Sequence, residues 1–568
     1  MAYIRKSQRL GDFLVENKVI TEKQLEDALK EQKIKKLKLG ETLISLGYVT
    51  RQEINDVLCR QLDIEYVDLR KETINEEIVR NVGEQTLRKY NVMPYAVDSQ
   101  RANVLKVAMD DPMNYTAIDD IAIVTGMTVQ PYLADNNQIS ALIDKYFGKT
   151  HADSIAEQFK KELLTYENVD EEEMARKETI ESSPIVQLVQ NLIEQAVRQR
   201  ASDIHIEPFE YNVRVRCRVD GVLREVIVYD KALYSAIVAR VKVISGMDIS
   251  EKRKPQDGRI TINVDHREYD IRVSNLPTVF GEKIVMRLAS KEGFRKDKKD
   301  LGLTPEDLVK FDNILKNPHG IILVTGPTGS GKSTTLYTAL NELSSDEVNI
   351  VTVEDPVEAN VDGVNQVQVN PKANLTFASA LRSILRQDPD IIMIGEIRDG
   401  ETAEIAVKAS ITGHLVVSTL HTNSTAASIS RLIDMGVEPY LLGDSLVGII
   451  AQRLVRRLCE CKQSYEASAE EKEILGVPVE SDLTLYKPCG CKLCGDSGYY
   501  GRIGVYEIMP ITRKIKSMIA ARCNADDISL QAEKEGMNTL RKAAGKYVME
   551  GITTFAEMMK ITHETDDL

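Results

Sequence analysis

Short apolar runs separated by polar turns mark the C-terminal half of the chain. The run Ile321 to Val324 has the length and composition of a buried parallel strand, and Ser333 to Leu343 has the pattern of a helix. Further apolar runs predict strands over 348–353, 390–394 and 414–420. Strands that alternate with helices in this way predict an α/β domain built on a parallel sheet.

A second pattern, helical and repeated, occupies the first 61 residues. The first copy contains Arg9, Leu10, Gly11, Leu14 and Gln32, and the second copy, 29 positions later, contains Lys38, Leu39, Gly40, Leu43 and Gln61. The apolar spacing is helical on both sides of a turn, so each copy predicts a helix-turn-helix hairpin with Thr21 or Thr50 capping its second helix. Two such hairpins can simply pack against each other, or they can form a ligand site with two equivalent halves.

The pattern changes divide the chain into four parts. Residues 1–147 form an N-terminal module, in which the repeat is followed by a small α/β part with strands over 104–109 and 128–133. Residues 148–183 are polar and rich in acidic side chains, which is typical of a solvated linker. Residues 184–293 are predicted to form a second α/β domain and residues 294–568 the nucleotide-binding domain.

Arginines alternate along one predicted strand of the second domain. Arg214, Arg216 and Arg218 are two positions apart, so they share one face of the strand. This face is either an exposed, salt-bridged surface or a positive surface that meets phosphate from a second direction.

The phosphate-binding motif lies between the strand at 321–324 and the helix that follows it. Gly326, Gly331, Lys332 and Ser333 fit G-x-x-x-x-G-K-[ST]. Its backbone N–H groups and the helix N-terminus favour phosphate, Lys332 is expected to reach the β- and γ-phosphates, and the Ser333 hydroxyl is expected to hold Mg²⁺. The predicted nucleotide-contacting residues are Gly326, Thr328, Gly329, Ser330, Gly331, Lys332, Ser333 and Thr334. The sequence therefore predicts that the protein binds a nucleoside triphosphate.

Charged side chains follow the predicted strands of the same domain. Glu354 and Glu358 follow the second strand, Glu396 follows the third, and His421 follows the fourth. Because ligands of open parallel sheets bind beyond the carboxyl ends of the strands, these side chains are expected to meet Lys332 in one crevice. Glu396 is expected to hold Mg²⁺ and its waters or to polarise the attacking water, and Glu354 and Glu358 to orient that water or act as base.

Cysteines are concentrated near the C-terminus. Five of the eight cysteines fall between Cys459 and Cys494. Cys459, Cys461, Cys491 and Cys494 form two pairs on two loops, which predicts a tetrahedral, structural Zn²⁺ site, although the first pair has the short spacing C-x-C. Substitution of Cys489 for one of the four ligands is one alternative, and free buried cysteines are the other.

Composition and charge narrow the function further. The 568 residues are sufficient for three or four domains, with 43% hydrophobic and 28% charged residues. The net charge of −14 argues against a nucleic-acid substrate. The chain has no apolar run of membrane-spanning length and no signal core after its first residues, so a cytoplasmic location is expected.

Four ordered motifs carry a resemblance to a known family. They are the phosphate-binding loop, the acidic stretch 353–358, the stretch 388–399 that contains Glu396, and the histidine stretch 412–422. The chain resembles the secretion ATPase superfamily of type II secretion and type IV pili, and most closely its pilus extension members. The resemblance implies a RecA-like P-loop core, ATP hydrolysis with Mg²⁺, a homo-hexamer, and action on an inner-membrane platform protein at the cytoplasmic face of the membrane.

The same resemblance extends to regulation and to further arginines. The repeated hairpins resemble a cyclic di-GMP-binding N-terminal domain, in which the arginine, leucine, glycine and glutamine positions of each copy contact the dinucleotide. Lys38 and Asn17 depart from that pattern, and lysine lacks the planar fork of arginine. Arg382 and Arg386, four positions apart on a predicted helix, are implied to approach the γ-phosphate, as is Arg216.

Three alternatives stay open from the sequence. A type II secretion ATPase shares the core and the cysteine loop. A nucleic-acid translocase is disfavoured by the net charge, and a nucleotide sensor without turnover is disfavoured by the complete set of Lys332, Glu396 and His421.

Overall fold

The structure is a computed structural model of the whole chain. It describes residues 184–265, 267–290 and 297–566, together with residues 10–146 apart from 18, 36–38, 40–41, 44–45, 47, 50, 63, 70–71, 73, 99–100, 102, 137, 141 and 144–145. The chain divides into two compact units, residues 1–157 with 491–496, and residues 158–490 with 497–568.

The N-terminal repeat forms helices that share one apolar core. Their bounds are α1 Leu10–Glu16, α2 Glu22–Lys35 and α4 Arg51–Leu62. Leu14 and Leu43, which occupy equivalent positions in the two copies, are both fully buried in this core. The side chain of Thr21 caps α2, because its hydroxyl accepts from the Gln24 N–H while the Gln24 side chain accepts from the Thr21 N–H. The predicted cap at Thr21 is therefore confirmed, whereas Thr50 lies outside the described residues.

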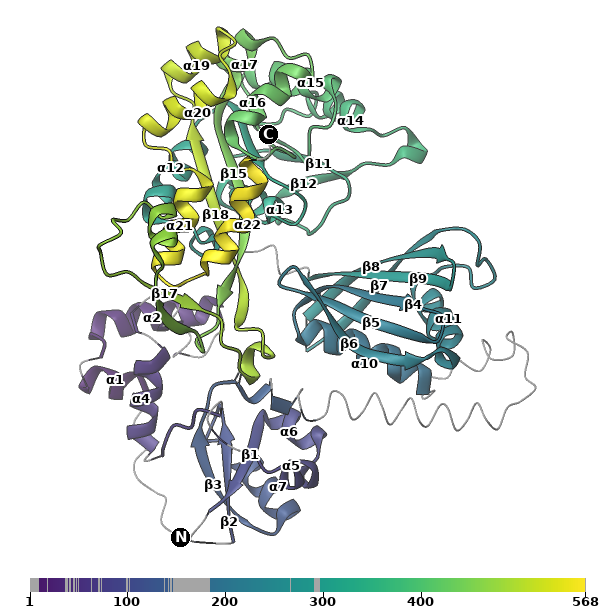
Figure 1. Cartoon of the computed structure of the whole chain (residues 1–568), viewed down its shortest axis with the longest axis vertical. Coiled ribbons are helices and arrows are strands. Elements are labelled where there is room, and N and C mark those ends of the chain that lie inside the picture. The colour runs from purple at the N-terminus through teal and green to yellow at the C-terminus, as the bar shows by residue number, and fades with distance from the viewer. Residues whose placement is uncertain are drawn as a thin grey trace. The chain divides into compact units, whose positions relative to one another are not determined.

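A three-stranded sheet completes the N-terminal unit. Strands β2 Val104–Met109 and β3 Thr128–Leu133 have the predicted bounds and pair in parallel. The sequence pattern missed β1 Val92–Val97, which pairs antiparallel with β2. The helices of this part whose bounds are fully described are α5 Glu76–Val82, α6 Glu84–Tyr90 and α7 Tyr115–Thr125 (Figure 1).

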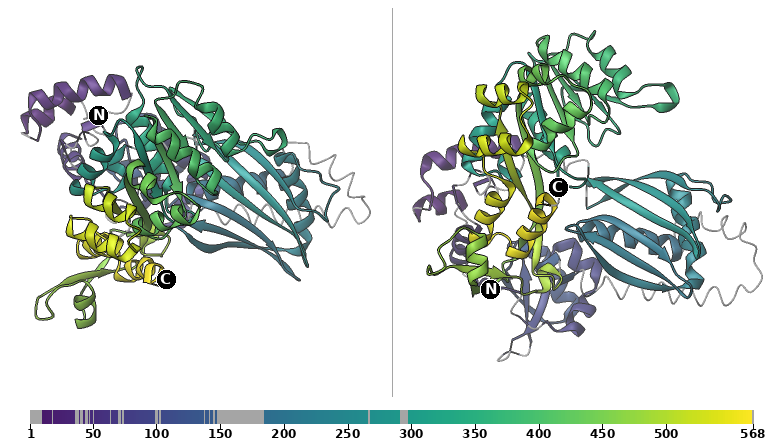
Figure 2. Two further views of the ribbon diagram at one scale, coloured as in Figure 1. Left: turned by 90° about the horizontal axis from the view of Figure 1, so that it is seen from above. Right: turned by 45° about the horizontal axis from the view of Figure 1, so that its top comes forward.

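The second domain is an antiparallel sheet with helices on one face. The sheet has the order β6-β5-β4-β9-β8-β7, and α10 and α11 pack against it (Figure 2). Burial alternates along β5, so its valines face the helices and its three arginines share the other face, as predicted. The bounds are α10 Pro184–Arg198, β4 Ala201–Pro208, β5 Asn212–Val219, β6 Val222–Asp230, α11 Tyr234–Ser245, β7 Gln256–Val264, β8 Arg267–Thr278 and β9 Gly281–Ser290.

The nucleotide-binding domain is built on a seven-stranded sheet. Its order is β12-β11-β13-β14-β10-β15-β18, with only the last pair antiparallel among the described residues. The bounds of its strands are β10 Gly320–Thr325, β11 Ile350–Glu354, β12 Val364–Gln368, β13 Ile391–Ile394, β14 Leu415–Leu420, β15 Leu446–Leu458 and β18 Tyr499–Pro510. The predicted strands are thus present, and β10 lies in the interior of the sheet, between β14 and β15.

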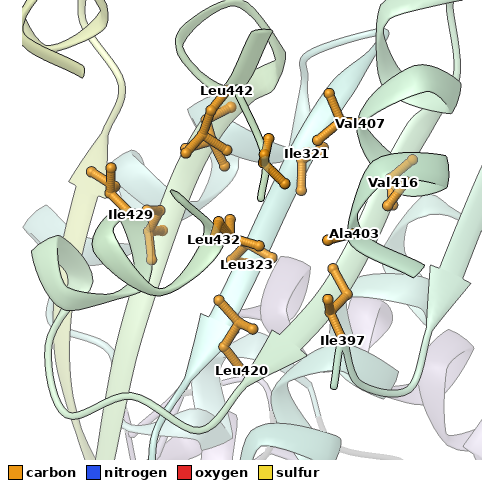
Figure 3. Packing of buried hydrophobic residues seen from close by; sticks show 14 of the residues in the cluster. Ile321, Leu323, Ile397, Ala403, Val407, Val416, Leu420, Ile429, Leu432 and Leu442 are labelled. Carbon is orange, nitrogen blue, oxygen red and sulfur yellow. The ribbon is translucent and has the colours of Figure 1, made fainter. Parts of the chain in front are cut away.

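Helices cover both faces of this sheet. Ile321 and Leu323 belong to the core on the face of α14 to α17 (Figure 3), and Ile322 and Val324 to the core on the face of α12 and α13. The bounds are α12 Pro305–Leu315, α13 Lys332–Leu343, α14 Phe377–Ile384, α15 Gly400–Ile411, α16 Thr425–Asp434, α17 Pro439–Ser445, α19 Arg513–Ala520, α20 Ala525–Lys534, α21 Leu540–Met549 and α22 Phe555–Asp566. A small hairpin, β16 Gln463–Glu466 and β17 Thr484–Lys487, flanks helix α18 Ala469–Ile474.

Candidate active site

The phosphate-binding loop joins β10 to α13. At two of its positions only glycine fits, because a Cβ atom would clash with neighbouring atoms. A Cβ on Gly326 would lie 2.5 Å from the Gln452 carbonyl oxygen, and one on Gly331 would lie 2.8 Å from Gln452 Nε2. Both glycines also have positive φ angles, of 149° and 91°. Side chains at these positions would therefore push the loop away from β15.

The N-terminus of α13 carries no side-chain cap. Gly331 is its N-cap residue, whereas the neighbouring helices α12, α14, α15 and α16 are capped by Thr304, Thr376, Asp399 and Ser424. The first N–H groups of α13 are thus available to an anion, and the helix dipole favours one there. The hydroxyl of Ser333 is on an exposed residue, as a magnesium ligand requires, and the buried Ser330 Oγ has no hydrogen-bond partner among the described residues.

Lys332 folds back onto the loop that it is expected to complete. Its Nζ donates to the Gly326 carbonyl at 2.7 Å and to the Pro327 carbonyl at 3.1 Å. Burial of the ammonium group lowers the pKa of Lys332 to about 8, although the Glu396 carboxylate acts in the opposite direction. A bound phosphate would supply the missing negative charge.

Glu396 and His421 meet at the ends of neighbouring strands. His421 Nε2 lies 3.1 Å from Glu396 Oε2, and Arg398, which also pairs with Asp355, forms a short ion pair with Glu396. Burial acts to raise the pKa of Glu396, but the hydrogen bonds from Arg398 and His421 outweigh it, so this pKa is lowered. Glu396 is therefore an anion that suits a metal ion or an oriented water. Its charge acts to raise the pKa of Lys332.

The other two predicted carboxylates are placed differently. Glu354 is only 3% exposed and accepts hydrogen bonds from Tyr337, Thr352 and Gln366. Glu358 is about one third exposed and forms a bidentate pair with Arg272 of β8, with Nη2–Oε2 at 2.6 Å. The structure thus brings Lys332, Glu396 and His421 together as expected, whereas the Glu354 carboxylate is buried among its three donors.

The three predicted arginines all have partners on the protein. Arg216 donates to both carboxylate oxygens of Glu207, at 2.9 and 2.8 Å. Arg382 pairs with Glu401, and Arg386 donates to the Arg382 carbonyl at 2.8 Å. Since α14 ends at Ile384, Arg386 lies beyond the helix that was expected to carry both side chains. The expectation that these arginines approach the γ-phosphate stays a prediction.

Residues that the sequence analysis did not single out complete the site. Tyr337 and Gln366 surround Glu354, Arg398 pairs with Glu396, and Gln452 packs against the loop and accepts from Thr335 at 2.8 Å. Arg398 could have been predicted from the sequence, because it is the second residue after Glu396. The contacts of the other residues depend on strands and helices that are distant in sequence.

The four predicted metal-binding cysteines gather in space. The sulfur atoms of Cys459, Cys461, Cys491 and Cys494 all lie within 4.8 Å of one another, and those of Cys491 and Cys494 are 3.7 Å apart. Thiolates around a tetrahedral zinc ion lie about 3.8 Å apart, since each Zn–S bond is about 2.3 Å. The four thiols therefore fit a zinc ion.

The predicted dinucleotide contacts are described only in part. Arg9, Lys38 and Gly40 lie outside the described residues, and of Leu10 and Gln32 only the backbone is described, in helices α1 and α2. Leu14 and Leu43 are core residues, Leu39 is partly buried against the same core, and a Cβ on Gly11 would lie 2.6 Å from Leu25 Cδ1. Gln61 lies on α4 and is half-buried. Packing within the helical core thus accounts for the buried leucines and for Gly11, and dinucleotide binding stays a prediction.

The fold and the loop define a class of protein: a P-loop nucleotide-binding protein with a parallel sheet and a second, antiparallel domain before it. A family model described as Type II/IV secretion system protein matches residues 178–560, and an MshEN domain model matches residues 62–153. The chain belongs to the Type II/IV secretion system protein family, which confirms the resemblance seen in the sequence and with it the expectation of an ATP-hydrolysing enzyme.

Individual relatives agree with this assignment. The type IV pilus assembly ATPase PilB of Myxococcus xanthus is 42% identical over 562 residues, which is 97% of this chain and 98% of the relative. PilB of Pseudomonas aeruginosa is 41% identical over 566 residues, 98% of each chain. The type II secretion system ATPase E of Vibrio cholerae is 48% identical over 389 residues, 68% of this chain and 77% of the relative.

A solved structure supports the fold. The ATPase DotB of Legionella pneumophila aligns with a TM-score of 0.51 at 20% identity, over 66% of this chain and 96% of that chain. Within the described part of the chain, no helix is long and apolar enough to span a membrane.

Proposed function

We propose that this protein is the ATPase that powers assembly of a type IV pilus. The observation that carries the proposal is the extent of similarity: the PilB relatives match 97–98% of this chain, N-terminal module included. The type II secretion relatives match 68% of the chain. Similarity to pilus ATPases therefore covers nearly all of the sequence, whereas similarity to secretion ATPases covers about two thirds of it.

The active site suggests how the chain's own residues take part in ATP hydrolysis. The N–H groups of residues 328–334 and the Lys332 ammonium would hold the phosphates, and Ser333 and Glu396 would hold Mg²⁺. Glu396 already contacts Arg398 and His421, so its carboxylate suits an electrostatic role in which it stays charged. His421 keeps Glu396 in place, and Glu358 is left as the carboxylate that orients the attacking water.

Assembly and location follow from the family resemblance. We propose a homo-hexamer that acts with an inner-membrane platform protein at the cytoplasmic face of the membrane, with no nucleic-acid substrate. The cysteine cluster is proposed to hold one structural Zn²⁺, supported by the four thiols within 4.8 Å of one another.

Two measurements in the source bacterium test the proposed function. Deletion of the gene should abolish surface pili and leave protein secretion intact, and the wild-type gene, but not one encoding Lys332→Ala, should restore the pili. Loss of secretion with normal pili would instead favour a type II secretion ATPase, whose relatives reach 49% identity within the shared core.

Cyclic di-GMP is proposed as a regulator of the same enzyme. The MshEN match over residues 62–153 supports this proposal, and the repeat at residues 1–61 supplies two equivalent sets of candidate contacts. Titration of the full chain by calorimetry should show binding that Arg9→Ala weakens. Arg80→Ala, which changes an exposed arginine paired with Glu76, is the matched control. Absence of heat at high micromolar dinucleotide with folded protein would leave the repeat as packed hairpins.

A further inference from the structure

Tyr337 links the helix of the phosphate-binding loop to the acidic segment beyond β11. It lies on α13, five residues after Lys332, and its side chain is only 2% exposed. Its hydroxyl group donates to Glu354 Oε2 and accepts from the N–H groups of Glu358, at 3.2 Å, and Ala359, at 3.5 Å. Burial, reinforced by the hydrogen bond to Glu354, raises the pKa of Tyr337 well above its ordinary value, so the hydroxyl keeps its proton.

Gln366 holds the next residues of the same segment. Its Nε2 donates to Glu354 Oε1 at 3.0 Å and to the Ala359 carbonyl at 2.9 Å, and its Oε1 accepts from the Val361 N–H at 2.8 Å. Tyr337 and Gln366 together therefore fix four backbone groups between residues 358 and 361. Both side chains are in turn oriented by the buried carboxylate of Glu354.

Glu354 has the properties of an anchor. Its carboxylate is buried and accepts from Thr352 at 2.7 Å as well as from Tyr337 and Gln366. A buried carboxylate with three donors would lose these hydrogen bonds if it moved toward a nucleotide, and that loss is costly in a low dielectric. Glu358, by contrast, has a partly exposed carboxylate that pairs with Arg272, and its backbone N–H begins the segment that Tyr337 and Gln366 fix.

We propose that Tyr337 and Gln366 are positioning residues for ATP hydrolysis: they transmit the fixed position of Glu354 to the backbone of Glu358 and so set the place of the Glu358 carboxylate relative to the phosphate-binding loop. The inference rests on the proposed ATPase function and assigns a role to residues that do not touch nucleotide. Because Tyr337 stands on the helix that begins at Lys332, the loop and Glu358 share one rigid support. A misplacement of about 1 Å at a reacting group can cost about 100-fold in rate.

Tyr337→Phe tests the proposal because it keeps the ring and removes the hydroxyl group. Phosphate release by the full chain should show a kcat reduced by about 10- to 100-fold with the KM for ATP changed less than about twofold. Tyr547→Phe is the matched control, since it also removes a buried hydroxyl of the same domain, one that donates to the Gly302 carbonyl. The control should retain kcat.

Two further variants separate positioning from folding. Gln366→Met removes the second link at nearly constant volume and should give the same selective loss of kcat, which keeps the test valid if Tyr337→Phe does not fold. In a Glu358→Gln background, Tyr337→Phe should reduce kcat by less than about twofold, because two residues that act as a unit are not additive.

The outcomes distinguish the inference from the function on which it rests. A wild-type protein that binds a fluorescent ATP analogue and releases no phosphate would overturn the ATPase function and the inference with it. An active wild type with Tyr337→Phe and Gln366→Met as active as Tyr547→Phe would overturn the inference alone. The inference would also be overturned if the loss of kcat in the double variant equalled the product of the losses caused by Tyr337→Phe and Glu358→Gln alone. Tyr337 would then act independently of Glu358.

Discussion

Replacement of Arg216 by alanine tests whether the positive face of the second domain is held together by its own ion pairs. Arg216 donates two hydrogen bonds to Glu207, and Lys283 and Arg214 reach the same carboxylate at 3.0 and 3.4 Å. Burial acts to raise the pKa of Glu207, but the hydrogen bonds from Arg216 and Lys283 outweigh it and lower this pKa to about 2, from 4.5. The ionised form of Glu207 is thus strongly favoured in the folded domain.

The size of the effect follows from these pKa values. The difference corresponds to ~3.4 kcal/mol in favour of the folded state. Because Lys283 and Arg214 share the carboxylate and the Arg216 side chain is 27% exposed, we assign ~1–2 kcal/mol of it to Arg216. A lowered carboxylate pKa stabilises the fold fully above about pH 4.5, and this contribution is lost as the pH falls toward 2.

Amide hydrogen exchange followed by mass spectrometry measures the stability of each segment separately. It therefore suits a protein of several domains. At pH 7, Arg216→Ala should speed exchange of β4 and β5 by about 5- to 30-fold. Arg253→Ala, whose side chain is 88% exposed, should leave exchange unchanged. Unchanged exchange in Arg216→Ala together with a turnover loss of about 10³-fold or more would refute this reasoning and would favour direct contact of Arg216 with phosphate.

Three further predictions follow from the site and the cores. Glu396→Gln should leave ATP bound and slow phosphate release by about 10²- to 10⁴-fold, whereas Lys332→Ala should lose productive binding; near-normal turnover of Glu396→Gln would move the main role to another carboxylate. Elemental analysis should find one zinc per chain, reduced in Cys461→Ser, and a metal-free protein that is folded and active would contradict the zinc site. Lys242→Met should destabilise the second domain by about 3–5 kcal/mol in urea unfolding, because Glu282, which lies 2.5 Å from Lys242 Nζ, would stay buried without its cation; a cost below about 1 kcal/mol would show that Glu282 is compensated by other groups.

The local parts of the active site could be predicted from the sequence. The phosphate-binding loop needs one strand, a few glycines and one helix within fewer than 30 residues, so its motif is contiguous and its elements have the expected bounds. Short apolar runs also predicted β2 and β3, and the paired spacing of cysteines predicted the four that gather in space. The cap at Thr21 is local in the same sense.

The tertiary structure decided which carboxylates are buried and which partners each of them has. From the sequence, Glu354 and Glu358 share one expected role, to orient the attacking water or act as base, and nothing in the sequence distinguishes the two. The pairing of β11 with β12 and the packing of α13 beside it surround Glu354 with Tyr337 and Gln366, and the pairing of β13 with β14 leaves Glu396 beside His421. The charge pairing of Arg216 with Glu207 likewise depends on the register of two strands.

The physical reason is the range of the interactions involved. Backbone propensity, capping and glycine geometry act over a few residues, and their patterns can be read along the chain. The burial of a carboxylate and the identity of its donors depend on which strands are neighbours in the sheet, and that order is fixed by cooperative packing of segments tens to hundreds of residues apart. The sequence therefore determined which chemical groups the candidate site contains, and the tertiary structure determined which of them are buried and which hold the others in place.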